Sequence, residues 1–167
     1  WLLAGVGAGL ALLGKYSAAF LGIGGVLLLL VDETMRRQLR RPGPWLAVLV
    51  ATIVFLPVIW WNIQNDFVSF RFQTEERLGN GQLGLKWFGQ LLVGQIAVLH
   101  PLLGVLLTAG LRFLLQRVRG DARALHLLAF GVPMLGYLLV QSFWIQVKIN
   151  WLAPAYVSLL LGLVLWW

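Results

Sequence analysis

Polar side chains that could bind a phosphate-bearing group stand at the ends of long apolar runs in three places of this sequence. The three clusters comprise Lys15 and Tyr16; Asn62, Arg71 and Gln73; and Lys148, Asn150 and Tyr156. A cation in a partly dehydrated pocket can bind a phosphate and stabilise the charge that it gains as a leaving group. The alternative role of each cation is to extend its charged end to the lipid headgroups and do nothing more.

A catalytic base is harder to find than these cations. A base has to be a carboxylate or a histidine within reach of its proton. Between residues 62 and 86 the acids are Asp66, Glu75 and Glu76, of which the first is typical of a turn and the other two of a solvated loop. His100 and His126 are isolated and the sequence has no cysteine, so we expect no metal site and no cofactor.

The amino-acid composition indicates the class of protein to which these side chains belong. Of 167 residues, 60% are hydrophobic and only 11% are charged, and the mean hydropathy is +0.84. Soluble domains are about one quarter charged. The composition therefore predicts an all-α, polytopic helical membrane protein, and it argues against a soluble enzyme, a nucleic-acid-binding domain and a disordered tail.

The apolar runs predict about five membrane spans in a single transmembrane domain. The predicted spans cover residues 1–31, 45–61, 87–115, 125–145 and 151–167. The first run would measure about 46 Å as one helix, whereas the hydrocarbon core is about 30 Å thick. It is therefore either one kinked helix or two short helices that meet at Lys15, and we favour the broken form. Glycines in this run, Gly5, Gly7, Gly9 and Gly14, are typical of close helix packing.

The arginines indicate the orientation of these spans. Seven of them flank the spans in two connecting segments, residues 32–44 and 116–124: Arg36, Arg37, Arg40, Arg41, Arg117, Arg119 and Arg123. Cytoplasmic loops carry an excess of such residues. We therefore expect these two loops in the cytoplasm and the loops 62–86 and 146–150 on the external face of the membrane. The net charge of +7 then reflects topology and predicts no nucleic-acid partner.

Four segments in this order resemble a known family. They are GLALLGKYSAAFL (9–21), RRPGPWLA (40–47), WWNIQNDFVSFRFQ (60–73) and VKINWLAPAY (147–156). Together they are similar to bacterial membrane glycosyltransferases of the GT-C fold, in the branch of the dolichyl-phosphate-mannose protein mannosyltransferases and the lipid A aminoarabinose transferases. The resemblance implies that the chain is the C-terminal part of such a transmembrane domain.

The same resemblance implies an activity and its partners. The enzyme would take a sugar from a polyprenyl-phosphate donor and pass it, with inversion, to a lipid, glycan or protein acceptor on the external face. Lys148 and Asn150 would contact the donor phosphate or sugar, and Arg71 and Gln73 would line the same cavity. The family's catalytic carboxylate lies in an early external loop, which would be upstream of Trp1, so we expect this segment alone to be inactive.

Two other functions are compatible with parts of the sequence. Prolines within the spans, with Lys15 and His100 at membrane depth, are features of transporters and channels. However, ion coupling usually places acids within the spans, and every acid here lies in a loop. A non-catalytic membrane assembly or a flippase-like subunit could also carry a donor-binding site without a base.

Overall fold

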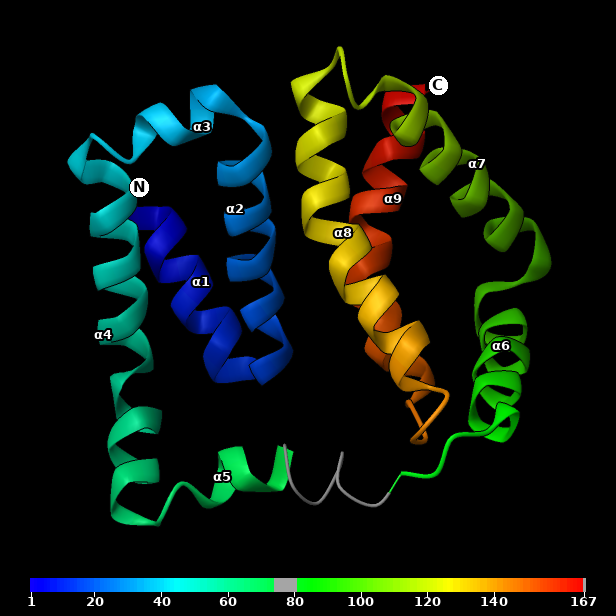
Figure 1. Ribbon diagram of the computed structural model, residues 1–167, viewed down its shortest axis with the longest axis horizontal. Helices are drawn as coiled ribbons and strands as arrows, with labels where there is room; N and C mark the ends of the chain where they lie inside the picture. Colours follow the sequence, from blue (N-terminus) through cyan, green and yellow to red (C-terminus); the bar gives the residue numbers. More distant parts are fainter. Residues whose placement is uncertain (74–80, 167) are drawn as a thin grey trace. The chain divides into compact units, whose positions relative to one another are not determined.

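The computed structural model describes residues 1–73 and 81–166, and within these ranges it contains helices and no strand (Figure 1). This confirms the predicted all-α class. The chain divides into two compact units, residues 1–76 and 77–167. Within the described residues, two helices are long and apolar enough to cross a membrane, and a sharply bent helix pair would make a third.

The first unit contains a helix pair, a basic connection and a long helix. Its elements are α1 (Leu2–Gly14), η1 (Tyr16–Ala18), α2 (Ala19–Val31), α3 (Glu33–Gln38), α4 (Pro42–Gln64) and α5 (Val68–Arg71). Lys15 has an extended backbone that separates α1 from η1 and α2, so the first apolar run has the broken form. Each half is 13 residues, or about 20 Å, and is shorter than the hydrocarbon thickness.

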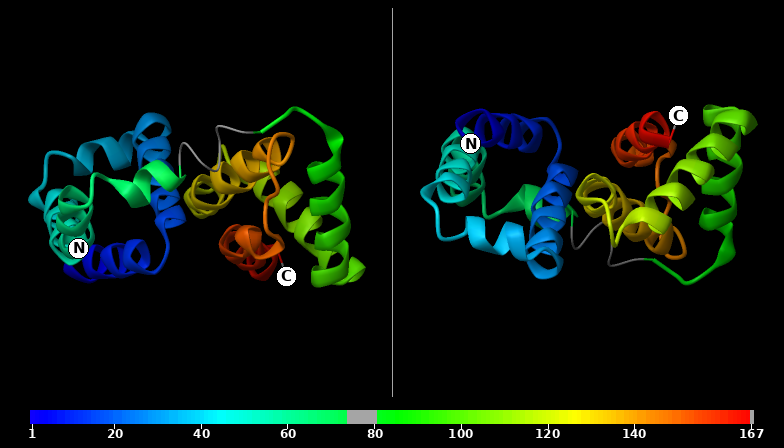
Figure 2. Two further views of the ribbon diagram at one scale, coloured as in Figure 1. Left: turned by 90° about the horizontal axis from the view of Figure 1, so that it is seen from below. Right: turned by 90° about the horizontal axis from the view of Figure 1, so that it is seen from above.

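Glycine allows α1 to lie directly against α4, as the two end-on views show (Figure 2). A Cβ atom built on Gly5 would lie 2.5 Å from the carbonyl oxygen of Ala47, and one built on Gly9 would lie 2.6 Å from the Cβ of Val54. Both glycines are buried. By contrast, nothing lies within 4 Å of a Cβ built on Gly7. The predicted close packing is therefore correct for one face of α1.

The second unit contains α6 (Leu85–Leu99), α7 (Pro101–Arg117), α8 (Ala122–Gln141), η3 (Ile149–Leu152) and α9 (Ala153–Trp166). Its core lies where α7, α8 and α9 pack together, and it includes Leu107, Leu114, Ala124, Leu128 and Leu159. The predicted span 87–115 is two helices, because α6 and α7 meet at His100 with a bend of 104°.

Prolines have different effects at different positions of these helices. Pro101 is the first residue of α7, where its missing N–H costs no hydrogen bond. Pro57 and Pro133 lie inside α4 and α8, and both helices continue through them.

Candidate functional site

Two of the three predicted clusters meet at one end of the first unit. The ring of Tyr16, in the turn between α1 and α2, lies 5.5 Å from the ring of Phe70 in α5 and 6.2 Å from that of Phe55 in α4. Lys15 and Arg71 are both exposed beside this aromatic contact, and Gln73 is half-buried. The connection through α3, with its arginines, lies at the opposite end of this unit (Figure 1). The unit thus separates its phosphate-binding candidates from its arginine-rich loop.

Asn62 holds the turn that places α5. It is fully buried at the end of α4, where its side-chain amide donates to the carbonyl oxygen of Val58 (2.9 Å). Its Oδ1 accepts from the backbone N–H of Ser69 (3.3 Å), and its own carbonyl oxygen accepts from the N–H of Phe67 (2.8 Å). The sequence suggested that Asn62 binds substrate. Because it has no exposed surface, its place in this structure is that of a positioning residue.

The turn itself has a backbone that side chains rarely adopt. Asp66 and Phe67 have φ values of 51° and 54°, in the left-handed region that favours glycine. The short α5 starts directly after Phe67, and the ring of Phe67 lies 6.3 Å from that of Phe70. Asp66 is exposed in this turn, which agrees with its interpretation as a turn residue.

The third cluster lies in the second unit, around η3. Lys148 and Asn150 are exposed and flank Ile149 at the start of η3. Lys148 and its neighbours line a cavity of about 350 Å³ together with Gln90 and Gln146 of the same unit. The cavity offers one cation and several amide groups, which is a set suited to a phosphate and the hydroxyls of a sugar.

A hydrogen-bond chain across α6 fixes the segment that carries these residues. The Tyr156 hydroxyl donates to Oε1 of Gln95 (2.6 Å), and Nε2 of Gln95 donates to the carbonyl oxygen of Ile149 (2.9 Å). These bonds tie α9, α6 and η3 together. Lys148 and Asn150 are the chain neighbours of Ile149, so the hydrogen bond from Gln95 fixes the backbone between these two residues.

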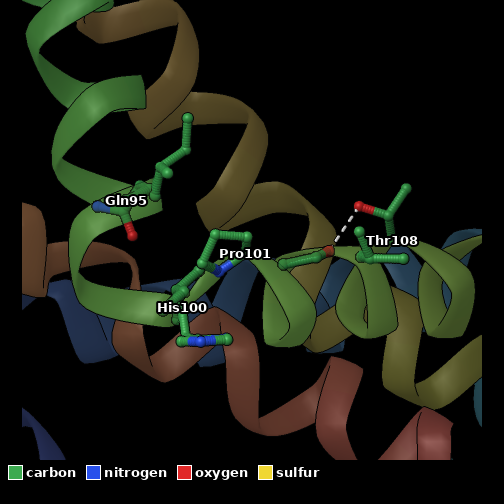
Figure 3. Close-up of a pocket in the computed structure, with 8 residues that line it drawn as sticks. Gln95, His100, Pro101 and Thr108 are labelled. Carbon is green, nitrogen blue, oxygen red and sulfur yellow. Dashed lines mark hydrogen bonds between the residues drawn. The ribbon is translucent and has the colours of Figure 1, made fainter.

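Gln95 is a candidate site residue that the sequence analysis did not single out. It lies within the apolar run predicted as the span 87–115. The sequence does carry a physical reason to single out this residue. A side-chain amide at membrane depth has no water to bind, so it must find hydrogen-bond partners in another helix. Gln95 also lines a mainly apolar cavity of about 490 Å³ at the α6–α7 bend, with His100, Pro101 and Thr108 (Figure 3).

The other end of the second unit carries its arginines, in the turn between α7 and α8 (Figure 1). Asp121 caps α8 by accepting from the N–H of Arg123 (2.9 Å) and pairs with the guanidinium of Arg123 (3.2 Å). These two interactions lower the pKa of Asp121 below its usual value of 3.8. As in the first unit, the arginine-rich connection and the candidate residues lie at opposite ends.

The histidines of the chain have structural contacts. Nδ1 of His100 accepts from the N–H of Leu102 and caps α7 (3.3 Å), and Nδ1 of His126 lies 2.7 Å from the carbonyl oxygen of Ala122. Across residues 1–73 and 81–166, no three His, Asp or Glu side chains gather where they could hold a metal ion. Glu75 and Glu76 lie outside the described residues.

Comparison with known proteins gives two matches. Residues 1–61 match the model of the dolichyl-phosphate-mannose-protein mannosyltransferase family. The chain is also 32% identical over 163 residues to the lipid A galacturonosyltransferase RgtD of Rhizobium johnstonii, an alignment that covers 94% of this chain and 33% of that protein. The chain thus spans about a third of the length of this relative. No solved structure matches significantly. Both matches confirm the resemblance to membrane glycosyltransferases of the GT-C type.

Proposed function

We propose that this chain, as a segment similar to GT-C-type membrane glycosyltransferases, binds the lipid-phosphate part of a polyprenyl-phosphate sugar donor. The observation that carries the proposal is the Lys148 cavity, which is lined by a cation and amide groups and includes Ile149, whose carbonyl oxygen accepts from Gln95. The turn of Lys15 and Tyr16, with Arg71 and Gln73, is a second candidate group of phosphate-binding side chains, within the first unit.

The reaction needs charge stabilisation of this kind. An acceptor hydroxyl attacks the anomeric carbon and loses its proton to a base, while the bond from that carbon to the phosphate oxygen breaks. The sugar passes through an oxocarbenium-like state with inversion, and the polyprenyl phosphate leaves with the bonding electron pair. Lys148 would neutralise the charge that develops on this phosphate. The resemblance assigns the base to a loop upstream of Trp1.

The site is proposed to face the periplasm from a bacterial inner membrane. Its support is that in each unit an arginine-rich connection lies at the end opposite to the candidate residues, as expected of cytoplasmic loops. The acceptor to try first is a lipid glycan, because the relative RgtD is named for transfer to lipid A. We propose that the two units belong to one transmembrane domain.

The test is Lys148→Ala in the full-length protein, with turnover of a polyprenyl-phosphate sugar as the readout. Removing one group that stabilises developing charge typically costs about 10²-fold in turnover. Lys148 is exposed, so the unfolding midpoint should not change. The matched control is Lys86→Ala, an exposed lysine of α6 whose ammonium lies over the ring of Trp87.

Three results would count against the proposal. Unchanged turnover of Lys148→Ala would remove this lysine from the site, and an equal loss in Lys86→Ala would show a general effect of charge. Translocation of the donor across the bilayer without sugar transfer would favour the flippase-like alternative.

A further inference from the structure

The arginine-rich connection of the first unit forms a cationic hollow. The short helix α3 joins α2 to α4 at the end opposite to α5 (Figure 1). Glu33, Arg36, Arg37 and Arg40 line a hollow of about 520 Å³ on this helix. Three guanidinium groups thus face one space with a single carboxylate, which gives the lining a net charge of 3 − 1 = +2.

Each arginine of the hollow is held differently. Arg36 donates to the carbonyl oxygen of Leu30 (2.7 Å) and so caps the C-terminal end of α2. Arg37 pairs with Glu33 (2.8 Å), and this exposed ion pair neutralises the carboxylate. The guanidinium of Arg40 makes no hydrogen bond or ion pair with the residues that the structure describes. The hollow therefore keeps donors for an anion, because a guanidinium has five N–H groups.

Exposed apolar residues precede and follow the segment that forms this hollow. Leu30 and Val31, the last residues of α2, are 68% and 65% exposed, and Trp45 at the start of α4 is 59% exposed. The indole N–H of Trp45 donates to the carbonyl oxygen of Leu39 (2.9 Å), which fixes the ring next to the end of α3. Tryptophan is enriched where the headgroups meet the hydrocarbon. A cationic pocket thus stands at the edge of a lipid-facing surface.

We propose that this hollow binds the headgroup of an anionic phospholipid. Arg37 and Arg40 would donate to the phosphate oxygens, and the acyl chains would lie along the exposed end of α2 or beside Trp45 at the other end of α3. Basic pockets of this kind bind acidic headgroups. The ligand chemistry is a phosphate anion, which could also be a free phosphate, but the apolar border is useful only to a lipid. The site is separate from the proposed sugar transfer and does not depend on it.

The experiment uses the delipidated full-length protein in detergent, titrated with dioleoyl phosphatidylglycerol and followed by native mass spectrometry. Zwitterionic dioleoyl phosphatidylcholine and inorganic phosphate are titrated in parallel. The test variant is Arg40→Gln, which removes a guanidinium without breaking a described contact. Its matched control is Arg119→Gln, an exposed arginine in the α7–α8 turn of the other unit.

We expect the protein to retain phosphatidylglycerol in preference to phosphatidylcholine. Arg40→Gln should weaken this binding about fivefold, which corresponds to about 1 kcal/mol for one basic residue at a membrane surface. Arg119→Gln should leave it unchanged. Equal losses in both variants, or equal binding of the two lipids, would overturn the proposal. Displacement of the lipid by an equal concentration of inorganic phosphate would show that the pocket binds a soluble anion instead.

Discussion

The chain of hydrogen bonds through Gln95 allows a sharp test by a double-mutant cycle. Tyr156→Phe removes one bond of 2.6 Å and leaves Oε1 of Gln95 without this donor. A net loss of about 1 kcal/mol is expected, within the range measured for bonds between membrane helices. Gln95→Ala removes the same bond and also the bond to the Ile149 carbonyl. Its expected cost is therefore about 2 kcal/mol.

The double variant decides whether these residues act as one unit. Because Gln95→Ala already removes the Tyr156 bond, adding Tyr156→Phe should cost little more, and the coupling energy should be about 1 kcal/mol. The assay is the free energy of unfolding in mixed micelles, followed by tryptophan fluorescence. In the same variants the turnover should fall with the stability change, because the Ile149 backbone carries Lys148 and Asn150 on either side.

Two outcomes would refute this reasoning. If the costs of the single variants simply add, Gln95 and Tyr156 are not coupled. If both singles unfold like the unchanged protein, the bonds do not hold η3. Gln116→Ala is the matched control, because Gln116 is exposed on α7 and its side chain makes no hydrogen bond within the described residues, and it should behave like the unchanged protein.

Three further substitutions test other parts of the structure. Gly5→Leu should lower the free energy of unfolding by about 1–3 kcal/mol, because its Cβ would meet the backbone of α4. Gly7→Leu is the control, because its side chain would face open space. Equal effects of the two variants on unfolding in detergent would contradict the packing of α1 on α4. Asn62→Leu should lower the free energy of unfolding by about 1–3 kcal/mol, because it leaves the Ser69 N–H unpaired. Hydrogen exchange of the Ser69 amide should become faster. An unchanged exchange rate would show that Asn62 does not hold α5. The lowered pKa of Asp121 means that its carboxylate stabilises the fold above pH 3.8 and loses this effect as the pH falls through the lowered value; the melting temperature of Asp121→Asn should therefore vary less in acid, and parallel acid profiles would refute it.

The sequence predicts the helices of this fold better than the breaks and bends between them. The break at Lys15 can be predicted from the sequence, because the first apolar run is longer than the bilayer is thick and has a lysine at its middle. The length of a helix and the cost of burying a charge both depend on the local sequence alone. The spacing of the glycines indicates close helix packing, but it does not show which face of α1 packs. In the structure, Gly5 and Gly9 meet α4 and Gly7 does not. The pair His100 and Pro101 marks an interruption, yet the bend of 104° depends on how α7 and α9 pack.

The candidate site shows the same division. Lys148 stands out because a lone cation between two apolar runs is visible in the sequence. Gln95 does not, because its importance comes from partners 54 and 61 positions away in the chain. Asn62 has the polarity of a ligand-binding residue, and only its complete burial shows that it supports a turn.

The bend at His100 also determines where water can go. The last carbonyl groups of α6 have no partner in their own helix, and Pro101 contributes no N–H to them. Lipid tails cannot solvate such groups. If this part of the chain lies within the bilayer, the notch beside Gln95, His100 and Thr108 must be filled by water or closed by neighbouring protein. The bend is therefore a place in the second unit where the backbone depends on water or on a neighbouring part of the protein.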